Sequence, residues 1–419
     1  MRLEGKRIVV GMAGGIACYK VAELVRLLVQ DGARVRVVMT ENAREFITPL
    51  TLQTLSGAPV STDTFSLTQE SEIGHIRLAD EADAIVVAPS TANLIGKLAA
   101  GIADDLLTTV LIATRAPRLL APAMNVHMYE NPIVQENIRR LRAVGYRVVG
   151  PASGDLACGY TGFGRLSEPE EIVEEVATLV AVQDLAGERI LVTAGPTREA
   201  LDPVRFLSNR SSGRMGYAVA RAARGRGAEV TLVSGPTGLR APAGVRLVPV
   251  TTAREMQRAV AEAYPQASVV VMTAAVADYR PERAAPRKVA KDAATGPLRL
   301  VRNPDILREL GGRKGSRLLI GFAAETHDVR QRAGHKLREK GLDLIVANDV
   351  TADGAGFDVE TNRVVLLDAG GDAEELPLLS KDEVAERLCD WIAGHRRPRD
   401  RATAPRAGRR KARRSTATR

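Results

Sequence analysis

Short, continuous apolar runs alternate with helical stretches along the first part of the chain. Strands that are buried on both faces read as such runs, because both of their alternating sides need apolar residues. Between the first two runs, Ala17–Val29 has helical apolar spacing, and Asp31-Gly32 ends it. This pattern is typical of βαβ units in a doubly wound parallel sheet. The predicted strands are Arg7–Val10, Val35–Met39, Ala84–Ala88 and Arg118–Ala121.

The same pattern starts again in the second half of the chain. A strand at Arg189–Thr193 is followed by a glycine turn, a long polar loop, a helix over Met215–Arg224 and a strand at Thr231–Ser234. Because the motifs between these elements differ from those of the first half, we predict two Rossmann-like domains rather than a tandem repeat. Further strands are expected at Val269–Thr273, Leu318–Phe322, Leu344–Ala347 and Arg363–Leu367, and a closing helix at Asp382–Ala393.

The boundary between the two α/β domains is expected within Gln183–Glu188, after a helical run over Glu170–Val182. A chain of 419 residues exceeds the usual size of one domain, which agrees with this division. We therefore predict domains at 1–186 and 187–395, followed by a tail at 396–419.

The tail explains the charge of the chain. The net charge is +9, but residues 396–419 hold eleven Lys and Arg against one acid, Asp400, so the rest of the chain carries −1. The tail has no aromatic residue and no apolar periodicity, and we expect it to be disordered. Weak, salt-sensitive binding of nucleic acid or another polyanion stays possible for such a run, whereas nothing indicates sequence-specific readout.

Membrane and secreted classes are not supported by the sequence. No apolar run approaches the ~20 residues that cross a bilayer, and the first residues enter a strand without the parts of a signal peptide. The three cysteines, Cys18, Cys158 and Cys389, are far apart and odd in number. They fit a reducing cytoplasm better than a disulfide framework or a cysteine-based zinc site.

Candidate ligand groups follow three strands of the first domain. The turn Gly11–Gly15 could present backbone N–H groups to a phosphate, although it is not a clean dinucleotide fingerprint and a tight turn alone would also explain it. Pro89–Asn93 and Ala121–Asn125 each follow a strand, at the edge where such sheets bind ligands. His75 lies on a separate segment, and a lone histidine is more often a surface or core residue whose hydrogen bonds are satisfied. Cys158 lies in a glycine-rich loop that is unlike a buried core.

These separated motifs resemble the flavin-dependent cysteine decarboxylases, a family that includes phosphopantothenoylcysteine decarboxylases. The resemblance rests on Gly14–Lys20, Pro89–Asn93, Pro122–Asn125 with Met128, and the Cys158 loop, and it covers nearly all of residues 1–182. It implies a flavoprotein decarboxylase fold that binds FMN. The implied FMN contacts are Gly14, Gly15, Ile16, Thr40, Ser90, Thr91, Ala92 and Asn93.

The resemblance also implies catalytic roles. His75 would be the base, Asn125 would hold the substrate carboxylate, and Cys158 would be the acid of the final step. Direct loss of CO₂ from a cysteinyl carboxylate would leave an unstabilised carbanion. A flavin can first oxidise the CH₂–SH group to a thioaldehyde, which accepts those electrons, and then reduce the resulting enethiol. Proton transfers by positioned side chains typically contribute ~10²–10⁴-fold each.

The second domain carries an unusually polar strand-to-helix connection. It runs from Thr193–Thr197 through Asp202–Arg205 to the run Ser208–Gly216, and offers hydroxyls, N–H groups and arginines before a helix. A solvated loop is the alternative reading. Lys336 and Lys340 are four residues apart and share a helix face, which suits either water or an anion such as a triphosphate.

This half resembles the phosphopantothenate–cysteine ligases over roughly residues 189–395, with Ser208–Gly216 as the most specific match. The resemblance implies a nucleotide-binding ligase fold that uses CTP to make an acyl-cytidylate. Asn209 would stabilise this intermediate, and Lys288 would neutralise charge on the transferring phosphate. The implied CTP contacts are Ala274, Ala275, Val276, Asp278, Lys288, Asn303, Pro304, Asp305, Ile306, Phe322, Lys336 and Lys340.

Two details accompany the ligase resemblance. Mg²⁺ is expected with the triphosphate, although the sequence has no dedicated metal motif and its ligands are unknown. The family usually has Lys-x-Lys-Lys at Lys288, where this chain has Lys288-Val289-Ala290-Lys291, so the third position has lost its charge.

The two halves make consecutive chemical sense, because the ligase product is the decarboxylase substrate. The sequence therefore predicts a cytoplasmic bifunctional enzyme of coenzyme A biosynthesis that acts on 4′-phosphopantothenate, cysteine and CTP. Three alternatives are a flavin decarboxylase of peptidyl cysteine, a pyridine-nucleotide dehydrogenase, and a polyanion-binding protein that acts through its tail. The resemblance further implies a homo-oligomer with the flavin near a subunit interface.

Overall fold

The computed structural model describes residues 2–63, 74–155, 161–290, 297–325, 327–349 and 359–396. Cys158, Lys291 and nearly all of the basic tail lie outside the described residues, so the prediction of a disordered tail stays a prediction. Within the described part, no helix is both long and apolar enough to cross a membrane.

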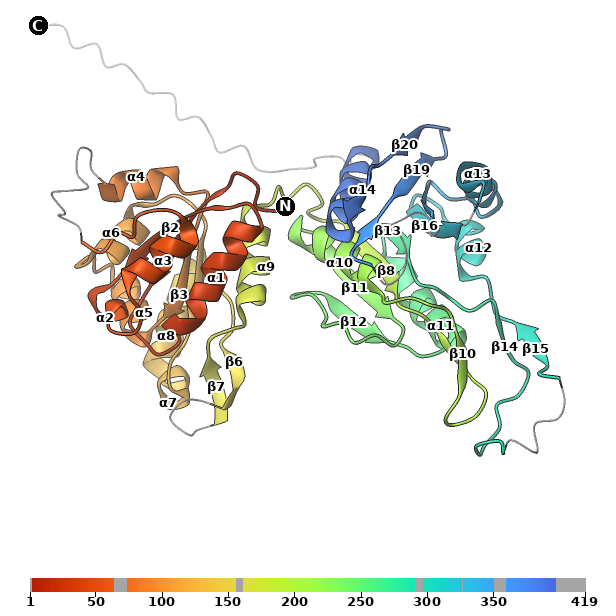
Figure 1. Ribbon diagram of the computed structural model, residues 1–419, viewed down its shortest axis with the longest axis horizontal. Helices are drawn as coiled ribbons and strands as arrows, with labels where there is room; N and C mark the ends of the chain where they lie inside the picture. Colours follow the sequence, from red (N-terminus) through yellow and green to blue (C-terminus); the bar gives the residue numbers. More distant parts are fainter. Residues whose placement is uncertain are drawn as a thin grey trace, which may run out of the picture.

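A parallel sheet organises the N-terminal half (Figure 1). Its five described strands lie in the order β2-β1-β3-β4-β5. The chain runs from β1 outward to β2 and then crosses to β3, so the order reverses between β1 and β3, and such a switch point is where open α/β sheets bind ligands. The strands are β1 Arg7–Met12, β2 Arg34–Met39, β3 Ala84–Ser90, β4 Arg118–Pro122 and β5 Tyr146–Val148.

Helices cover both faces of this sheet. Ile8 and Val10 of β1 belong to a core shared with the α1 and α9 helices, whereas Val9 packs on the opposite side with α5, α6 and α8. Alternate residues of one strand thus enter separate cores, which explains the continuous apolar run. The helices are α1 Cys18–Gln30, α2 Glu41–Arg44, α3 Pro49–Ser56, α4 Gly74–Glu81, α5 Ala92–Ala100, α6 Leu106–Ala113, α7 Val126–Glu130, α8 Pro132–Ala143 and α9 Pro169–Val180.

A larger sheet organises the C-terminal half, in the described order β12-β11-β8-β13-β16-β17-β19-β20. The strands from β12 to β17 are parallel, but β19 is antiparallel to both of its neighbours. The sequence predicted this strand but not its direction. The bounds are β8 Arg189–Ala194, β11 Glu229–Ser234, β12 Arg246–Pro249, β13 Val269–Met272, β16 Leu318–Glu325, β17 Leu344–Asp349, β19 Val364–Asp368 and β20 Ala373–Glu375.

This second sheet is also covered on both faces, which confirms two doubly wound domains. One core joins α10 and α14 to the sheet, and the other joins α11, α12 and α13 to its opposite face. The elements are α10 Arg214–Gly225, α11 Ala253–Ala263, the 3₁₀ turn η1 Tyr264–Gln266, α12 Ile306–Gly311, α13 Val329–Glu339, α14 Lys381–His395, and the short pair β18 Thr361–Asn362 with β21 Leu379–Ser380.

An arm projects from the C-terminal half, below the sheet in Figure 1. We define it as residues 198–208, 279–290 and 297–302. It contains two antiparallel pairs, β9 Arg198–Ala200 with β10 Phe206–Ser208, and β14 Tyr279–Pro281 with β15 Leu300–Arg302. The long polar loop expected after β8 therefore contains a hairpin, β9 with β10, which satisfies part of its backbone groups.

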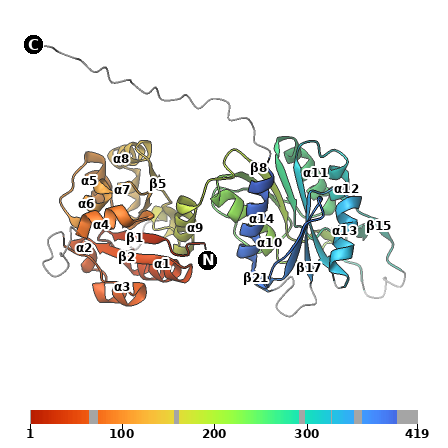
Figure 2. The same ribbon diagram turned by 90° about the horizontal axis from the view of Figure 1, so that it is seen from above.

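The two halves meet along α9 and α10, which lie between the sheets in Figure 2. Glu174 of α9 pairs with Arg221 of α10 at 3.2 Å. Arg226, just after α10, forms a bidentate pair with Asp184 of the connecting segment, with its Nε and Nη2 at 2.9 and 2.5 Å from the two carboxylate oxygens.

Candidate active sites

A cavity of about 1010 Å³ lies at the carboxyl ends of β1, β3 and β4. The connections that follow β1, β3 and β4, which the sequence predicted at this edge of the sheet, line it together with residues 40–42 after β2. Most of the residues that resemble FMN contacts line it. They are Gly14, Gly15, Ile16, Thr40, Thr91, Ala92 and Asn93, joined by Asn125, Met124 and Met128.

The glycine turn of this cavity is shaped by close backbone packing. A Cβ atom at Gly14 would lie 2.4 Å from Cβ of Asn42 and 2.6 Å from its carbonyl carbon, so no larger residue fits without displacing α2. The turn leads into α1, whose first residues have no side-chain cap. Instead, the N–H groups of Cys18 and Lys20 donate to the carbonyls of Gly15 and Ala17 at 3.0 and 3.1 Å. The start of the helix is therefore closed onto the glycine turn, and it is the turn itself that lines the cavity.

Two hydroxyl groups beside the cavity are buried without a hydrogen-bond partner among the described residues. They are Oγ1 of Thr40, which lines the cavity, and Oγ of Ser90, which is fully buried next to Thr91. A buried hydroxyl without a partner costs free energy, which indicates a missing polar ligand. Together with the apolar Ile16 and Met128, these groups fit a ligand that combines an aromatic ring system with a phosphate.

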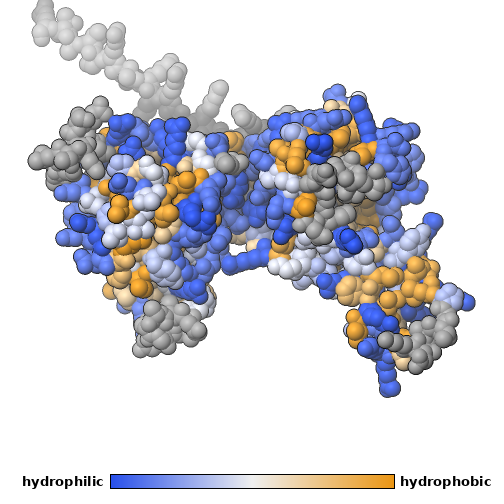
Figure 3. Space-filling view, viewed as in Figure 1, coloured by the Kyte–Doolittle hydropathy of each residue, from blue (hydrophilic) through white to orange (hydrophobic). Residues whose placement is uncertain are grey.

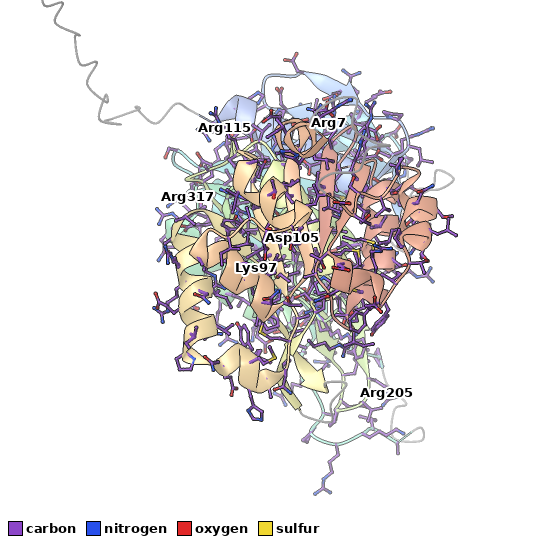
Figure 4. The ribbon with its side chains drawn as sticks, turned by 90° about the vertical axis from the view of Figure 1, so that its left-hand side faces the viewer. Arg7, Lys97, Asp105, Arg115, Arg205 and Arg317 are labelled. Atoms are coloured by element: carbon purple, nitrogen blue, oxygen red, sulfur yellow. The ribbon has the colours of Figure 1, made fainter. Side chains whose placement is uncertain are left out.

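A charged group at the rim of this cavity was missed by sequence reasoning. Nζ of Lys97 lies 2.8 Å from Oδ1 of Asp104 and 3.6 Å from Oδ2 of Asp105 (Figure 4). The hydrogen bond to Asp104 is the main cause that raises the pKa of Lys97. Asp105 also caps α6 through Thr108, so the pair is anchored to a helix start. The sequence identifies Asp105 only as a helix cap, which does not indicate that Lys97 lies at a ligand cavity.

The predicted catalytic residues of the first half are placed unequally. Asn125 lines the cavity, and its Oδ1 caps α7 by accepting the N–H of His127 at 2.9 Å. His75 does not line the cavity: it belongs to α4, which Figure 1 shows at the opposite end of this half from α7. Its Nδ1 is buried without a partner among the described residues. Cys158 lies outside the described residues, between β6 Ala152–Asp155 and β7 Thr161–Arg165.

The β7 strand connects the Cys158 loop to the cavity. Gly164 and Arg165 of β7 line the cavity, and the carbonyl of Gly164 accepts the N–H of Met124 at 3.0 Å. A Cβ atom at Gly164 would lie 2.2 Å from the carbonyl oxygen of Met124, so this contact needs glycine. The strand β7, which follows Cys158 in the sequence, is therefore attached to the turn that presents Asn125.

A second cavity, of about 450 Å³, lies at the carboxyl ends of β8, β13, β16 and β17. It is open to the N-terminus of α10, and the polar run before that helix forms one wall. The predicted residues that line it are Asn209, Ala274, Ala275, Val276, Asp278, Phe322 and Lys336.

Hydrogen bonds from the first strand-to-helix connection hold the turn that follows β13. Oγ1 of Thr193 accepts the N–H of Ala274 at 3.2 Å, and Oγ1 of Thr197 accepts the N–H of Ala277 at 3.0 Å. Asn209 donates its Nδ2 to the carbonyl oxygens of Val276 at 3.0 Å and Ala275 at 3.4 Å. Asn209 is thus part of one rigid wall with the predicted nucleotide-binding turn.

Close packing brings α10 against this turn. A Cβ atom at Gly216 would lie 2.5 Å from Oγ1 of Thr273 and 2.6 Å from Cβ of Ala194, so glycine permits the start of α10 to approach both strands. The helix begins after Gly213, which has a φ of 79° that glycine adopts without strain. The N-terminus of α10 is therefore directed at the cavity.

Lys336 is fixed by a buried acid. Its Nζ lies 2.7 Å from Oε1 of Glu325, whose other oxygen accepts Nε of Arg332 at 2.6 Å. Burial works to raise the pKa of Glu325, but the hydrogen bonds from Lys336 and Arg332 outweigh it, so the pKa is lowered overall. Glu325 therefore stays ionised at neutral pH.

The other predicted nucleotide contacts do not line this cavity. Asn303 stands behind it and donates Nδ2 to the carbonyl of Ala277 at 2.8 Å. Nζ of Lys340 lies 3.1 Å from Oδ2 of Asp305, so these two predicted contacts form an ion pair with each other. Ile306, the first residue of α12, is buried in the core, Pro304 lies two residues before it, and Lys288 lies exposed on the arm.

Several lining residues were not predicted. Lys381, at the start of α14, is only 6% exposed, and its Nζ donates to the carbonyl of Val359. Asn348 donates to Oδ1 of Asn362 at 3.4 Å, and Oδ1 of Asn348 is buried without a partner in the described part of the chain. All three line the cavity. Their spacing in sequence carries no signal, because a lysine in the first turn of a helix and two asparagines in strands look structural.

No group of three or more His, Cys, Asp or Glu in the described ranges could hold a metal ion.

Comparisons with known proteins agree on both halves of the chain. Residues 1–181 match the Flavoprotein family, and residues 185–395 match the family described as DNA/pantothenate metabolism flavoprotein C-terminal domain. The Coenzyme A biosynthesis bifunctional protein CoaBC of Bacillus subtilis is 50% identical over 395 residues, which is 93% of this chain and 97% of that protein. The protein of the same name from Escherichia coli K12 is 47% identical over 397 residues, covering 94% and 98%.

A solved structure, that of the C-terminal domain of a Coenzyme A biosynthesis bifunctional protein CoaBC, is 47% identical with a TM-score of 0.44 and covers 51% of this chain and 97% of its own. The two family matches and the two relatives, which are matched over nearly their whole length, thus agree on both halves of the chain. The chain therefore belongs to the family of bifunctional coenzyme A biosynthesis enzymes, with an N-terminal flavoprotein domain and a C-terminal DNA/pantothenate metabolism domain.

Proposed function

We propose that the chain joins cysteine to 4′-phosphopantothenate with CTP at the second cavity and decarboxylates the product, 4′-phosphopantothenoylcysteine, at the first. The observation that carries this proposal is the presence of two separate cavities in one chain, each at the carboxyl edge of its own sheet. Domains at 1–186 and 187–395 would each hold one of them. A decarboxylase of peptidyl cysteine would need no second cavity of this kind, so we do not favour that alternative.

Ligation requires two displacements. A carboxylate oxygen of 4′-phosphopantothenate attacks the α-phosphorus of CTP and pyrophosphate leaves; the amine of cysteine then attacks the acyl carbon and CMP leaves. Asn209 lies against the Ala275–Val276 turn and would hold the acyl-cytidylate there during the second step. Lys336 and Lys288 would neutralise phosphate charge, which is the main way a protein accelerates such chemistry.

Mg²⁺ would accompany the triphosphate as its counter-ion. Asp278, the one acid among the described residues that line this cavity, would contact it. Asn303, Pro304, Asp305, Ile306 and Lys340 would act from behind the wall: Asn303 supports the backbone of Ala277, and the Lys340–Asp305 pair fixes the start of α12.

Decarboxylation requires a cofactor, and the first cavity fits FMN. The Gly14–Ile16 turn would hold its phosphate, and the hydroxyls of Thr40 and Ser90 would gain the partners that they lack. When bound, the flavin supplies reversible two-electron oxidation of the cysteinyl CH₂–SH group. Asn125 would hold the carboxylate of the substrate until CO₂ leaves. Cys158 would deliver the last proton to carbon.

The position of His75 supports a homo-oligomer. Because His75 does not line the cavity of its own chain, it could serve as the base only at the cavity of an adjacent copy. Exposed apolar side chains on the arm offer a further contact surface (Figure 3). They are Val204, Phe206, Tyr279, Leu298 and Leu300. A cytoplasmic location would suit the buried free thiols of Cys18 and Cys389.

The deciding experiment supplies the purified protein with 4′-phosphopantothenate, cysteine, CTP and Mg²⁺. Products are followed by mass spectrometry, and bound flavin by the visible spectrum. A yellow protein that forms 4′-phosphopantetheine, CO₂ and CMP supports both reactions. A colourless protein that stops at 4′-phosphopantothenoylcysteine would leave only the ligase, and a protein that releases no CMP would return the decarboxylase of peptidyl cysteine.

A further inference from the structure

Asp202 is a buried carboxylate that accepts several hydrogen bonds from other residues of the arm. Its side chain is fully buried, and Oδ1 accepts the backbone N–H groups of Val204 and Arg205, each at 2.8 Å. Oδ2 accepts Nε of Arg205 at 3.0 Å and Nη2 at 2.6 Å. The hydrogen bond from Arg205 is the main cause that lowers the pKa of Asp202. The carboxylate therefore holds both the backbone and the guanidinium of Arg205 in one geometry.

The same pair reaches across the arm to the segment that carries Lys288. Oδ2 of Asp202 accepts the N–H of Val289 at 3.3 Å, and Nη2 of Arg205 donates to the carbonyl of Val289 at 3.0 Å. Nearby, the N–H of Ala285 donates to the carbonyl of Leu201 at 2.9 Å. Val289 is thus clamped through both of its backbone polar groups, immediately after Lys288.

This clamp matters because the segment has no regular structure of its own. Residues 282–290 belong to no strand or helix, and Lys288 is exposed. Among the described residues of 286–290, Val289 is the one for which a hydrogen bond to the rest of the chain is found. Without the clamp, an exposed lysine on such a segment would sample many positions. Each binding event would then carry the entropic cost of ordering it.

We propose that Asp202 is a positioning residue for the ligase reaction: it holds Arg205 and the Lys288 segment together on the arm, so that Lys288, which lies outside the second cavity in this structure, is presented to the triphosphate of CTP from one position rather than many. Asp202 itself touches no substrate. This inference rests on the proposed role of Lys288 in CTP-dependent ligation.

The direct test is Asp202→Asn in the full-length protein. The change preserves size but removes the charge that binds Arg205 and replaces one acceptor oxygen with a donor. We expect kcat/KM for CTP to fall by ~10²-fold, the cost of a misplaced catalytic group. Decarboxylation of supplied 4′-phosphopantothenoylcysteine by the same protein should not change. Asp343→Asn is the matched control, because Asp343 also accepts one cation and one backbone N–H, Lys314 at 2.8 Å and Leu319 at 2.7 Å.

Trypsin gives a second readout that needs no substrate. It cleaves after Arg287 and Lys288, and we expect Asp202→Asn to speed cleavage there relative to Asp343→Asn. If Asp202→Asn fails to fold, Val289→Pro removes the N–H that Asp202 accepts and leaves the Asp202–Arg205 pair intact. Because trypsin does not cleave a Lys–Pro bond, cleavage after Arg287 alone is compared between this variant and its control. Ala290→Pro is its control, since no hydrogen bond of that N–H is found in the described part of the chain.

The outcomes separate the two proposals. Slower use of CTP together with faster cleavage in Asp202→Asn or Val289→Pro supports the positioning role. Equal CTP kinetics and equal cleavage in variant and control overturn it, even when the wild-type protein ligates normally. A wild-type protein that releases no CMP overturns the proposed function instead, and the cleavage rates still decide whether the clamp exists.

Discussion

Glu325 and Lys336 face each other at the wall of the second cavity, with 2.7 Å between Oε1 and Nζ. Glu325 is 3% exposed and also holds Arg332, so one buried charge fixes two cations. Removing the acid leaves both cations without their partner, which is costly even where they are half exposed.

Glu325→Gln should therefore reduce the free energy of unfolding at neutral pH by about 1–3 kcal/mol, as expected for hydrogen bonds to a charged group. Because the pKa of Glu325 is lowered below its ordinary value of 4.5, its contribution is complete above that pH and is lost as the pH falls further. Denaturant titrations at several pH values measure both effects. Glu309→Gln, at an exposed pair with Arg313, should change stability by less than ~0.5 kcal/mol. Equal stabilities of the two variants would contradict the assignment.

Asn209→Asp should block ligation but spare decarboxylation. The Nδ2 group of Asn209 donates to two carbonyl oxygens, and a carboxylate in its place would be repelled by both. The variant should still form the acyl-cytidylate. Its release of CMP should be slower by a factor of ~10² or more, as when a preorganised donor is lost. Mass spectrometry of the ligation mixture detects the intermediate. A simultaneous defect in the decarboxylation of supplied substrate would contradict the assignment of two separate sites.

Ser90→Ala should lower flavin retention without lowering stability. Oγ of Ser90 is buried without a partner in the described residues, so its removal deletes an unsatisfied polar group from the flavin-free protein. The flavin-to-protein absorbance ratio after dialysis measures retention, and thermal unfolding of the flavin-free protein measures stability. Thr114→Val is the control, because Oγ1 of Thr114 already donates to the carbonyl of Ala79 at 2.7 Å. That variant should lose stability and keep its flavin.

Deletion of residues 397–419 should leave both reactions intact. The truncation retains Arg396, which donates to the carbonyl of Asp184 and therefore contributes to the junction of the two halves. It removes most of the positive charge of the tail, so any weak binding to heparin or nucleic acid should disappear at low salt. Steady-state assays of both reactions, with and without the tail, are sufficient. Loss of either activity would revive the idea of a protein that acts through its tail.

The structure of the arm could not be predicted from local sequence patterns. Apolar runs such as Arg7–Val10 predicted strands correctly, because a strand buried on both faces needs a continuous run. The polar stretch around Asp202 gave no such signal, yet it forms a hairpin that is joined by hydrogen bonds to a segment more than eighty residues later. Long-range pairing of polar backbone leaves no periodicity that a local reading can find.

The sequence by itself determined the two sheets, their helices on both faces, and the turns that carry Gly14, Asn125, Asn209 and Asp278, because hydrophobic periodicity and strand-end position are local properties. Only the tertiary structure decided which of the predicted residues share a cavity. It separated His75 from Asn125 and Lys288 from Lys336, and it brought Lys381 and Asn348 to the wall of the second cavity. These outcomes depend on how distant segments pack, and the free energy of that packing is shared among many contacts rather than carried by any one motif.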